Sequence, residues 1–236
     1  MSAPIRISQD LLFRTINDRD DAITDYAAGN LSPARYALMS CAVELNPDLA
    51  ESAMFQTELA ACLINEIRPV PLSPLLIGET LAKLSYREAD EVQNVAANDH
   101  VSRQTRVAPR PLRDLMGGTG LRDIQWKSLI PGMAIHDVLG NRRTEEGDRL
   151  YLLKAKGGMR MPEHSHNGEE WTLILNGAYT VEGRTFRRGD LHIEDETKTH
   201  SPTIEEGEDC ICLVMTEGPL VMKSWLPKLI QKVVGI

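Results

Sequence analysis

The stretch GMRMPEHSHNGEEWTLILNG, residues 158–177, carries the strongest structural signal in the chain. His164 and His166 are two residues apart, so both side chains face the same side of a strand. Glu170 shares their parity if the strand resumes after the turn at Asn167 and Gly168. Two imidazoles and one carboxylate suit zinc, iron(II), manganese, nickel or copper. The stretch therefore predicts strand residues that bind a divalent metal.

The sequence on both sides of this stretch is typical of β structure. Short runs rich in branched and aromatic residues alternate with glycine turns, which favours a sandwich or a barrel. The runs are DIQWKSLI (123–130), AIHDVL (134–139), RLYLLKA (149–155), EEWTLILNGAYTV (169–181), RTFRRGDLHIED (184–195), DCICLVMT (209–216) and PLVMKSWL (219–226). Barrel strands can bring a fourth ligand from a distant position, and His200 is the best candidate. His136 and His192 are interpreted as ordinary polar strand residues.

The N-terminal part of the chain has helical periodicity instead. We expect helices over residues 11–28, 34–45, 48–67 and 75–87. Ser32 is the expected N-cap of the second helix, with Pro33 as its first residue, and Asn46-Pro47 ends that helix. The third helix has an apolar stripe that exceeds what a lone helix can bury. The stripe contains Leu49, Ala53, Phe55, Leu59, Leu63 and Ile67.

The polar segment at residues 91–111 lacks periodicity and ends in Pro-Arg-Pro, as an interdomain linker does. We therefore expect an α+β protein of two domains, a helical bundle over residues 1–90 and an all-β barrel over residues 112–236. The net charge of −8 argues against direct nucleic-acid binding, and no apolar run is long enough to span a membrane. The N-terminus lacks the pattern of an export signal, which favours a cytoplasmic location with all four cysteines as thiols.

The metal-ligand pattern resembles the first motif of the cupin superfamily, G-x5-H-x-H-x3-E-x6-G, at every spacing from Gly158 to Gly177. That resemblance implies a double-stranded β-helix barrel with His164, His166, Glu170 and His200 as the ligands of one divalent metal. The second cupin motif is less complete. Gly189 and His200 keep its ends, whereas Asp195 and Thr197 replace its proline and its second glycine, which puts the local loop geometry in question.

The chain as a whole resembles the ChrR-type anti-sigma factors, cytoplasmic repressors that sequester an ECF sigma factor of RNA polymerase. The resemblance rests on DYAAGNL (25–31), RPVPLSP (68–74), HSHNGEE with the WTLILNGAY strand, and the tail from DCICL to SWLPKLIQ. It implies that the helical domain binds the sigma factor and that the cupin domain responds to an oxidative signal such as singlet oxygen. It also implies zinc as the preferred metal, with iron, nickel and manganese as alternatives.

One departure from the family concerns a second zinc site in the helical domain. Zinc-dependent members carry one histidine upstream of the YAAG segment and then an H-x3-C-x2-C signature. In this chain those places hold Asn17, Ala42, Asn46 and Leu49, and Cys41 is displaced by one position. None of the four is a usual zinc ligand, so we predict that the N-terminal zinc is absent. Either packing replaces the zinc or the domain has drifted, and the apolar stripe of the third helix favours replacement.

Two other functions remain open from the sequence. A site of three histidines and one glutamate is also what cupin dioxygenases and isomerases use, although the sequence offers no clear acid or base. Alternatively, the metal only stabilises a scaffold. Cys210, Cys212, Met159, Met161 and Met215 are oxidisable groups that could serve a sensor, or simply fill the core. A homodimer formed through edge strands is also open.

Overall fold

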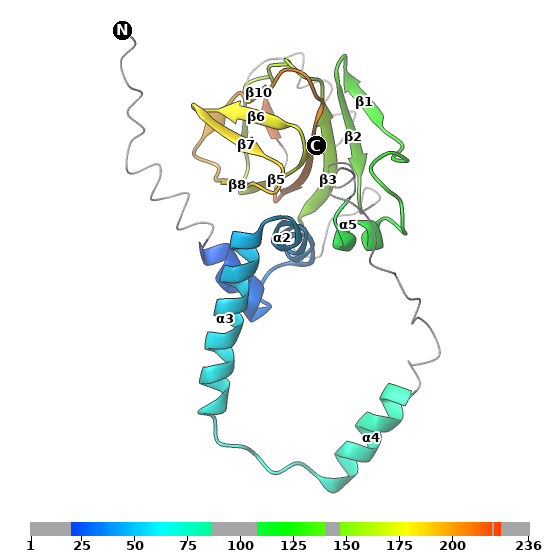
Figure 1. The fold of residues 1–236 in the computed structure, drawn as a ribbon, viewed down its shortest axis with the longest axis vertical. Coiled ribbons are helices and arrows are strands. Elements are labelled where there is room, and N and C mark those ends of the chain that lie inside the picture. The colour runs from blue at the N-terminus through cyan, green and yellow to red at the C-terminus, as the bar shows by residue number, and fades with distance from the viewer. Residues whose placement is uncertain (1–19, 86–107, 140–146, 219, 223–236) are drawn as a thin grey trace.

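The computed structural model describes residues 20–85, 108–139, 147–218 and 220–222 (Figure 1). Helices precede a β domain, in agreement with the α+β class expected from sequence. The start of the first expected helix, most of the expected linker and the end of the last expected strand lie outside these ranges. None of the helices in the described ranges is long and apolar enough to cross a membrane.

The helices begin and end close to the predicted positions. A helical segment covers residues 20–28, followed by α2 (Pro33–Leu45), α3 (Pro47–Asn65) and α4 (Pro74–Ser85). The Ser32 side chain accepts a hydrogen bond from the backbone N–H of Arg35, so it caps α2 as the sequence predicted. A short helix, α5 (Arg110–Leu115), begins inside the expected linker and leads into the β domain.

Each of the seven predicted β runs contains at least one strand. The strands are β1 (Lys127–Ile130), β2 (Met133–Asp137), β3 (Arg149–Ala155), β4 (His164–His166), β5 (Glu170–Asn176), β6 (Ala178–Val181), β7 (Arg184–Arg187), β8 (Leu191–Glu194), β9 (Thr199–His200), β10 (Thr203–Ile204), β11 (Cys210–Thr216) and β12 (Leu220–Met222). They form a six-stranded sheet in the order β1-β2-β3-β11-β5-β8 and two three-stranded sheets, β10-β6-β7 and β12-β4-β9. The described pairings thus give a sandwich of separate sheets rather than one closed sheet.

The core of the β domain continues into the helices. Side chains of the six-stranded sheet alternate between two apolar clusters, as expected for a sheet covered on both faces. On β11, Leu213 belongs to a cluster that also holds Leu38 and Met39 of α2, whereas Val214 belongs to a cluster inside the β domain. Helix α2 therefore covers the outer face of the sheet and shares one core with it.

Helices α3 and α4 are different, because most of their apolar side chains face solvent. Only Leu49 and Ala53 are buried on α3. Figure 1 shows α3 extending away from the β domain and α4 standing apart from the other helices, so the described helices do not form a packed bundle. The exposed large apolar side chains in this region are Met54, Phe55, Leu59, Leu63, Ile64, Ile67, Val70, Leu72, Leu75, Leu76, Ile77 and Leu81.

Candidate metal centre

Three short β segments bring the four predicted ligands together. His164 and His166 are the buried ends of β4, and the intervening Ser165 points away from them. β4 pairs with β9 in a register that sets His164 opposite His200. Glu170 begins β5, after a turn in which Gly168 adopts a left-handed conformation with φ of 85°. The predicted parity of these side chains agrees with their placement.

The four side chains form a compact buried cluster. One potential ligand atom from each lies within 4.8 Å of the others. The Nε2 atom of His200 is 2.8 Å from Nε2 of His164 and 3.2 Å from Nε2 of His166. An oxygen of Glu170 lies 3.2 Å from Nδ1 of His166. Such spacing places four donors around one small volume, which is the arrangement that a single metal ion requires.

The contacts of the outer ring nitrogens explain why the Nε2 atoms face one another. Nδ1 of His164 lies 2.7 Å from the carbonyl oxygen of Pro162, and Nδ1 of His200 pairs with Glu194. Each Nδ1 therefore donates outward and leaves the Nε2 lone pair pointing inward. When all three imidazoles present an unprotonated Nε2, their lone pairs and the Glu170 carboxylate repel one another unless a cation lies between them. The donor set thus fits a divalent metal.

Burial keeps two imidazoles of the cluster neutral, as metal binding needs, but acts against the ionised form of the carboxylate. It lowers the pKa of His164 to about 4 and that of His166 to about 3, so both imidazoles are neutral and able to ligate at pH 7. Burial also raises the pKa of Glu170 to about 7. A bound cation would favour the ionised form of this carboxylate and oppose that rise.

Two neighbours of the cluster were not singled out by the sequence. Glu194 is 4% exposed and lies opposite Glu170 in the β5–β8 register. His192, two residues earlier on β8, accepts or donates a 2.8 Å hydrogen bond with the Tyr179 hydroxyl and lies 3.4 Å from Glu194. His192 is thus a strand residue as expected, but one connected to the cluster. His192 and Glu194 are two residues apart, so they face the same side of their strand. This spacing was the signal in the sequence that could have indicated their place beside the cluster.

The turn before His200 also answers the question left by the incomplete second cupin motif. Asp195 accepts a hydrogen bond of 2.9 Å from the backbone N–H of Thr197 and another from its hydroxyl. This Asx turn substitutes for the family's proline and glycine, because an aspartate side chain can hold a turn of the backbone locally. His200 consequently reaches the cluster without the standard turn residues.

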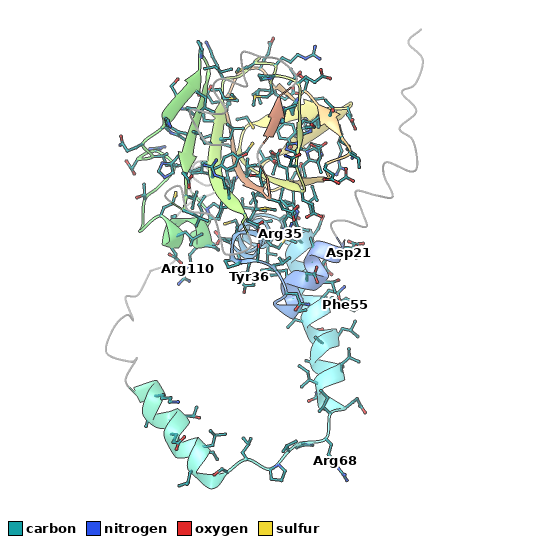
Figure 2. The ribbon with its side chains drawn as sticks, turned by 180° about the vertical axis from the view of Figure 1, so that it is seen from behind. Asp21, Arg35, Tyr36, Phe55, Arg68 and Arg110 are labelled. Atoms are coloured by element: carbon teal, nitrogen blue, oxygen red, sulfur yellow. The ribbon has the colours of Figure 1, made fainter. Side chains whose placement is uncertain are left out.

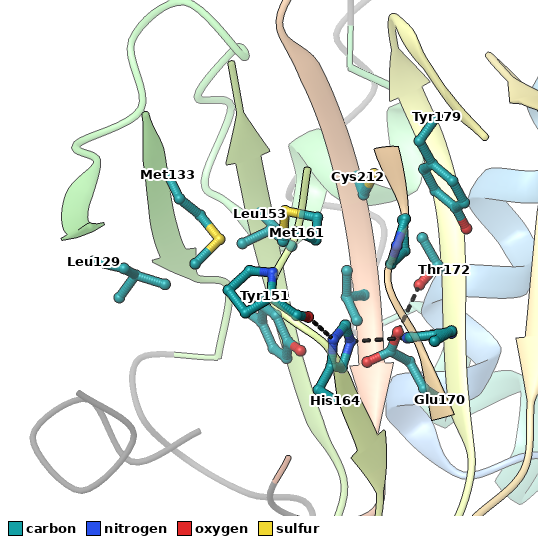
Figure 3. A pocket seen from close by; sticks show the side chains of 14 residues that line it. Leu129, Met133, Tyr151, Leu153, Met161, His164, Glu170, Thr172, Tyr179 and Cys212 are labelled. Carbon is teal, nitrogen blue, oxygen red and sulfur yellow. Dashed lines mark hydrogen bonds between the residues drawn. The ribbon is translucent and has the colours of Figure 1, made fainter. Parts of the chain in front are cut away.

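An apolar pocket of about 70 Å³ opens beside the cluster (Figure 3). Three of the four candidate ligands, His164, Glu170 and His200, contribute to its wall. The remaining lining residues are mostly apolar or sulfur-containing: Leu129, Met133, Tyr151, Leu153, Met161, Pro162, Thr172, Tyr179, Pro202, Cys212 and Val214. A small molecule in this pocket would lie directly against the ligand set.

The positions of the family's N-terminal zinc ligands have other surroundings in this chain. Ala42 and Leu49 are buried in the core shared by the helices and the sheet. Asn46 caps α3 by accepting from the backbone N–H groups of Asp48 and Leu49, and its side-chain amide donates to the carbonyl of Gly189. Asn17 lies outside the described residues. The absence of an N-terminal zinc therefore stays a prediction.

The fold and this cluster define a cupin-like protein, and comparisons with known proteins agree. The family model described as the ChrR cupin-like domain matches residues 118–220. The anti-sigma-E factor ChrR of Cereibacter sphaeroides is 34% identical over 212 residues, which are 90% of this chain and 94% of that protein. This chain therefore belongs to the ChrR family of anti-sigma factors.

A solved structure of the family gives the same result. The crystal structure of Rhodobacter sphaeroides SigE in complex with the anti-sigma ChrR matches with a TM-score of 0.65 at 31% identity, covering 84% of this chain and 96% of that chain. An RmlC-like cupin protein from Ralstonia eutropha matches 45% of this chain and 71% of its own, with a TM-score of 0.39 at 23% identity. The family resemblance predicted from sequence is confirmed by the first of these matches and by the curated relative.

Proposed function

We propose that this protein is a cytoplasmic anti-sigma factor whose α3 and α4 helices bind an ECF sigma factor. The observation that carries the proposal is the apolar surface of these helices, where Phe55 is 63% and Leu63 is 66% exposed. Apolar surface on this scale marks a protein interface. Membership of the ChrR family supplies the partner class, because the related ChrR structure is a complex with the sigma factor SigE. Bound sigma factor would complete the bundle that the free helices lack.

Co-purification with a tagged ECF sigma factor from the same genome tests this interface. Phe55→Asp and Leu63→Asp should abolish the complex, since each introduces a charge into an apolar contact. Both side chains are exposed, so circular dichroism of the free variants should match that of the natural protein. Glu58→Gln on the same helix is the matched control and should retain the complex. Unchanged binding by both aspartate variants would refute the assignment of this surface.

We further propose that the β domain, folded as a double-stranded β-helix, binds one divalent metal, preferably zinc, through His164, His166, Glu170 and His200. When bound, the metal supplies a positive charge that ties β4, β5 and β9 together. The support is the convergence of three Nε2 atoms in a buried cluster. Metal analysis of the purified protein should give one ion per chain, and His164→Ala should lower the stoichiometry towards zero.

Response to an oxidative signal is the third part of the proposal. Its support is the sulfur chemistry of the pocket beside the ligands, where Met133, Met161 and Cys212 contribute to the wall. Illumination of the sigma complex with a singlet-oxygen photosensitiser should release the sigma factor, with mass spectrometry locating the oxidised side chains. If the complex stays intact after this treatment, the protein does not respond to singlet oxygen, although it still binds the sigma factor.

The same pocket favours one second candidate, a metal-dependent enzyme acting on a small apolar substrate. Its 70 Å³ volume adjoins three candidate ligands, as in a substrate site. Turnover of diketones or thiols by the iron-loaded protein, lost in His164→Ala, would support this function. Lack of turnover under the same loading would leave the anti-sigma function alone.

A further inference from the structure

Arg35 of α2 contacts the segment of the β domain that holds the candidate metal ligand Glu170. Its guanidinium donates to the Glu169 carboxylate at 3.0 Å and forms an ion pair with Glu217. It also lies over the Trp171 ring, 5.4 Å from the centroid. Figure 2 shows Arg35 where the helices meet the β domain. Arg35 therefore joins α2 to the start of β5.

The alternation of side chains at the start of β5 gives this contact its significance. Glu170 belongs to the ligand cluster, whereas its two neighbours, Glu169 and Trp171, both contact Arg35. Successive residues of a strand face opposite sides, so the metal site and the helix contact opposite sides of the same three residues. A displacement of the Glu170 backbone would move both of its neighbours, Glu169 and Trp171, against Arg35.

Close packing limits the ways in which this segment can relax independently. The backbone N–H of Glu169 donates to Glu217 at 2.8 Å, and the N–H of Glu217 donates back to the Glu169 carbonyl at 3.2 Å. The Trp171 indole N–H donates to the Glu169 carboxylate at 3.0 Å. A Cβ on Gly168 would clash with the Glu217 side chain. These contacts make the Arg35 environment a rigid extension of the Glu170 strand.

We propose that Arg35 couples metal occupancy of the β domain to the docking of α2, and so to the sigma-binding helices that follow it. The inference rests on the proposed function and names the contact that links metal binding in the β domain to sigma binding by the helices. With metal bound, Glu170 is held in place and the Glu169, Glu217 and Trp171 side chains stay ordered against Arg35. Loss of metal frees Glu170, disorders these contacts and loosens α2 on the sheet.

Hydrogen exchange in the full-length chain tests the coupling without the sigma factor. The zinc-loaded and chelator-treated proteins should differ by about fivefold or more in exchange at the α2 amides. In Arg35→Gln this ratio should fall towards one, because the ion pairs that join α2 to Glu169 and Glu217 are lost. Glu169→Gln tests the same contact from the β domain, where the side chain is 43% exposed and the amide oxygen can still accept from Trp171. Arg110→Gln, which removes an exposed pair with Asp114, is the control and should keep the natural ratio.

Linkage supplies a second measurement, since coupling between two sites must be reciprocal. Zinc affinity, measured by competition with a chromophoric chelator, should differ severalfold between the free chain and its sigma complex, and this difference should vanish in Arg35→Gln. If zinc and the sigma factor both bind but the zinc affinity is the same in the free chain and in the complex, the coupling is refuted and the proposed function stands. The same conclusion follows if the two affinities differ and Arg35→Gln leaves that difference intact. Failure of the natural chain to bind zinc, or to form a sigma complex, instead removes that part of the proposed function together with the coupling.

Discussion

Glu194 lies outside the proposed ligand set and contacts one of its members, His200. Its carboxylate pairs with Nδ1 of His200, while His200 presents Nε2 to His164. Burial would raise the pKa of Glu194, but its hydrogen bond with His200 and the neighbouring histidines hold that pKa below its ordinary value. Glu194 is therefore ionised at neutral pH and fixes the tautomer that a ligating imidazole needs.

Glu194→Gln should weaken zinc binding by about 10- to 100-fold, because an amide holds the His200 ring less strongly than a carboxylate does. Chelator competition provides the measurement. Glu206→Gln, on an exposed loop of the same domain, is the control and should bind zinc normally. Natural affinity in Glu194→Gln would mean that the carboxylate does not orient the ligand.

The four cysteines should differ widely in thiol reactivity. Cys62 is exposed, whereas Cys41, Cys210 and Cys212 are buried free thiols. Burial raises the pKa of Cys41 to about 12, so it holds no appreciable thiolate at pH 8. Alkylation of the native protein followed by mass spectrometry should label Cys62 first, and Cys62→Ser should remove the rapid phase. Rapid labelling of Cys41 in the folded chain would contradict its burial.

At the level of the elements, the contact between α2 and the loop before β8 depends on one glycine. Gly189 has φ of 88°, and a Cβ at this position would lie 3.0 Å from the carbonyl oxygen of Leu45, at the end of α2. The next residue, Asn46, donates its side-chain amide to the Gly189 carbonyl. The close approach of two backbones therefore fixes how the helical part meets the sheet.

Gly189→Ala should lower the free energy of unfolding by more than Gly183→Ala does. Both glycines are left-handed, at φ of 88° and 77°, which costs an alanine roughly 1–2 kcal/mol. Only Gly189 adds a backbone clash, since nothing lies within 4 Å of a Cβ on Gly183. Urea denaturation of the two variants measures the difference. Equal destabilisation would show that the α2 contact can shift without cost.

For the whole molecule, the β domain and α2 share one core, while α3 and α4 extend from it with apolar side chains exposed. Metal binding within the β domain should stabilise this shared core. With free zinc at about 100 times its dissociation constant, binding contributes about 2.7 kcal/mol, or a rise in Tm of roughly 5–10 °C.

Chelator treatment should therefore lower the Tm of the natural protein by that amount, as followed by circular dichroism. The variant His200→Ala should have a Tm that chelator does not change, because it lacks one of the four ligands. An equal chelator effect in both proteins would place the stabilising metal elsewhere in the chain.

The amino-acid sequence was enough to predict the helix and strand periods, the N-cap at Ser32 and the common strand face of His164, His166 and Glu170. These are local patterns, set by backbone geometry and by neighbours a few residues away. Tertiary structure alone placed Glu194 against His200, united α2 and the sheet in one core, left the α3 stripe exposed and brought Arg35 to Glu169, 134 positions away. Contacts of such separation depend on how strands and helices pack, and no local pattern encodes them.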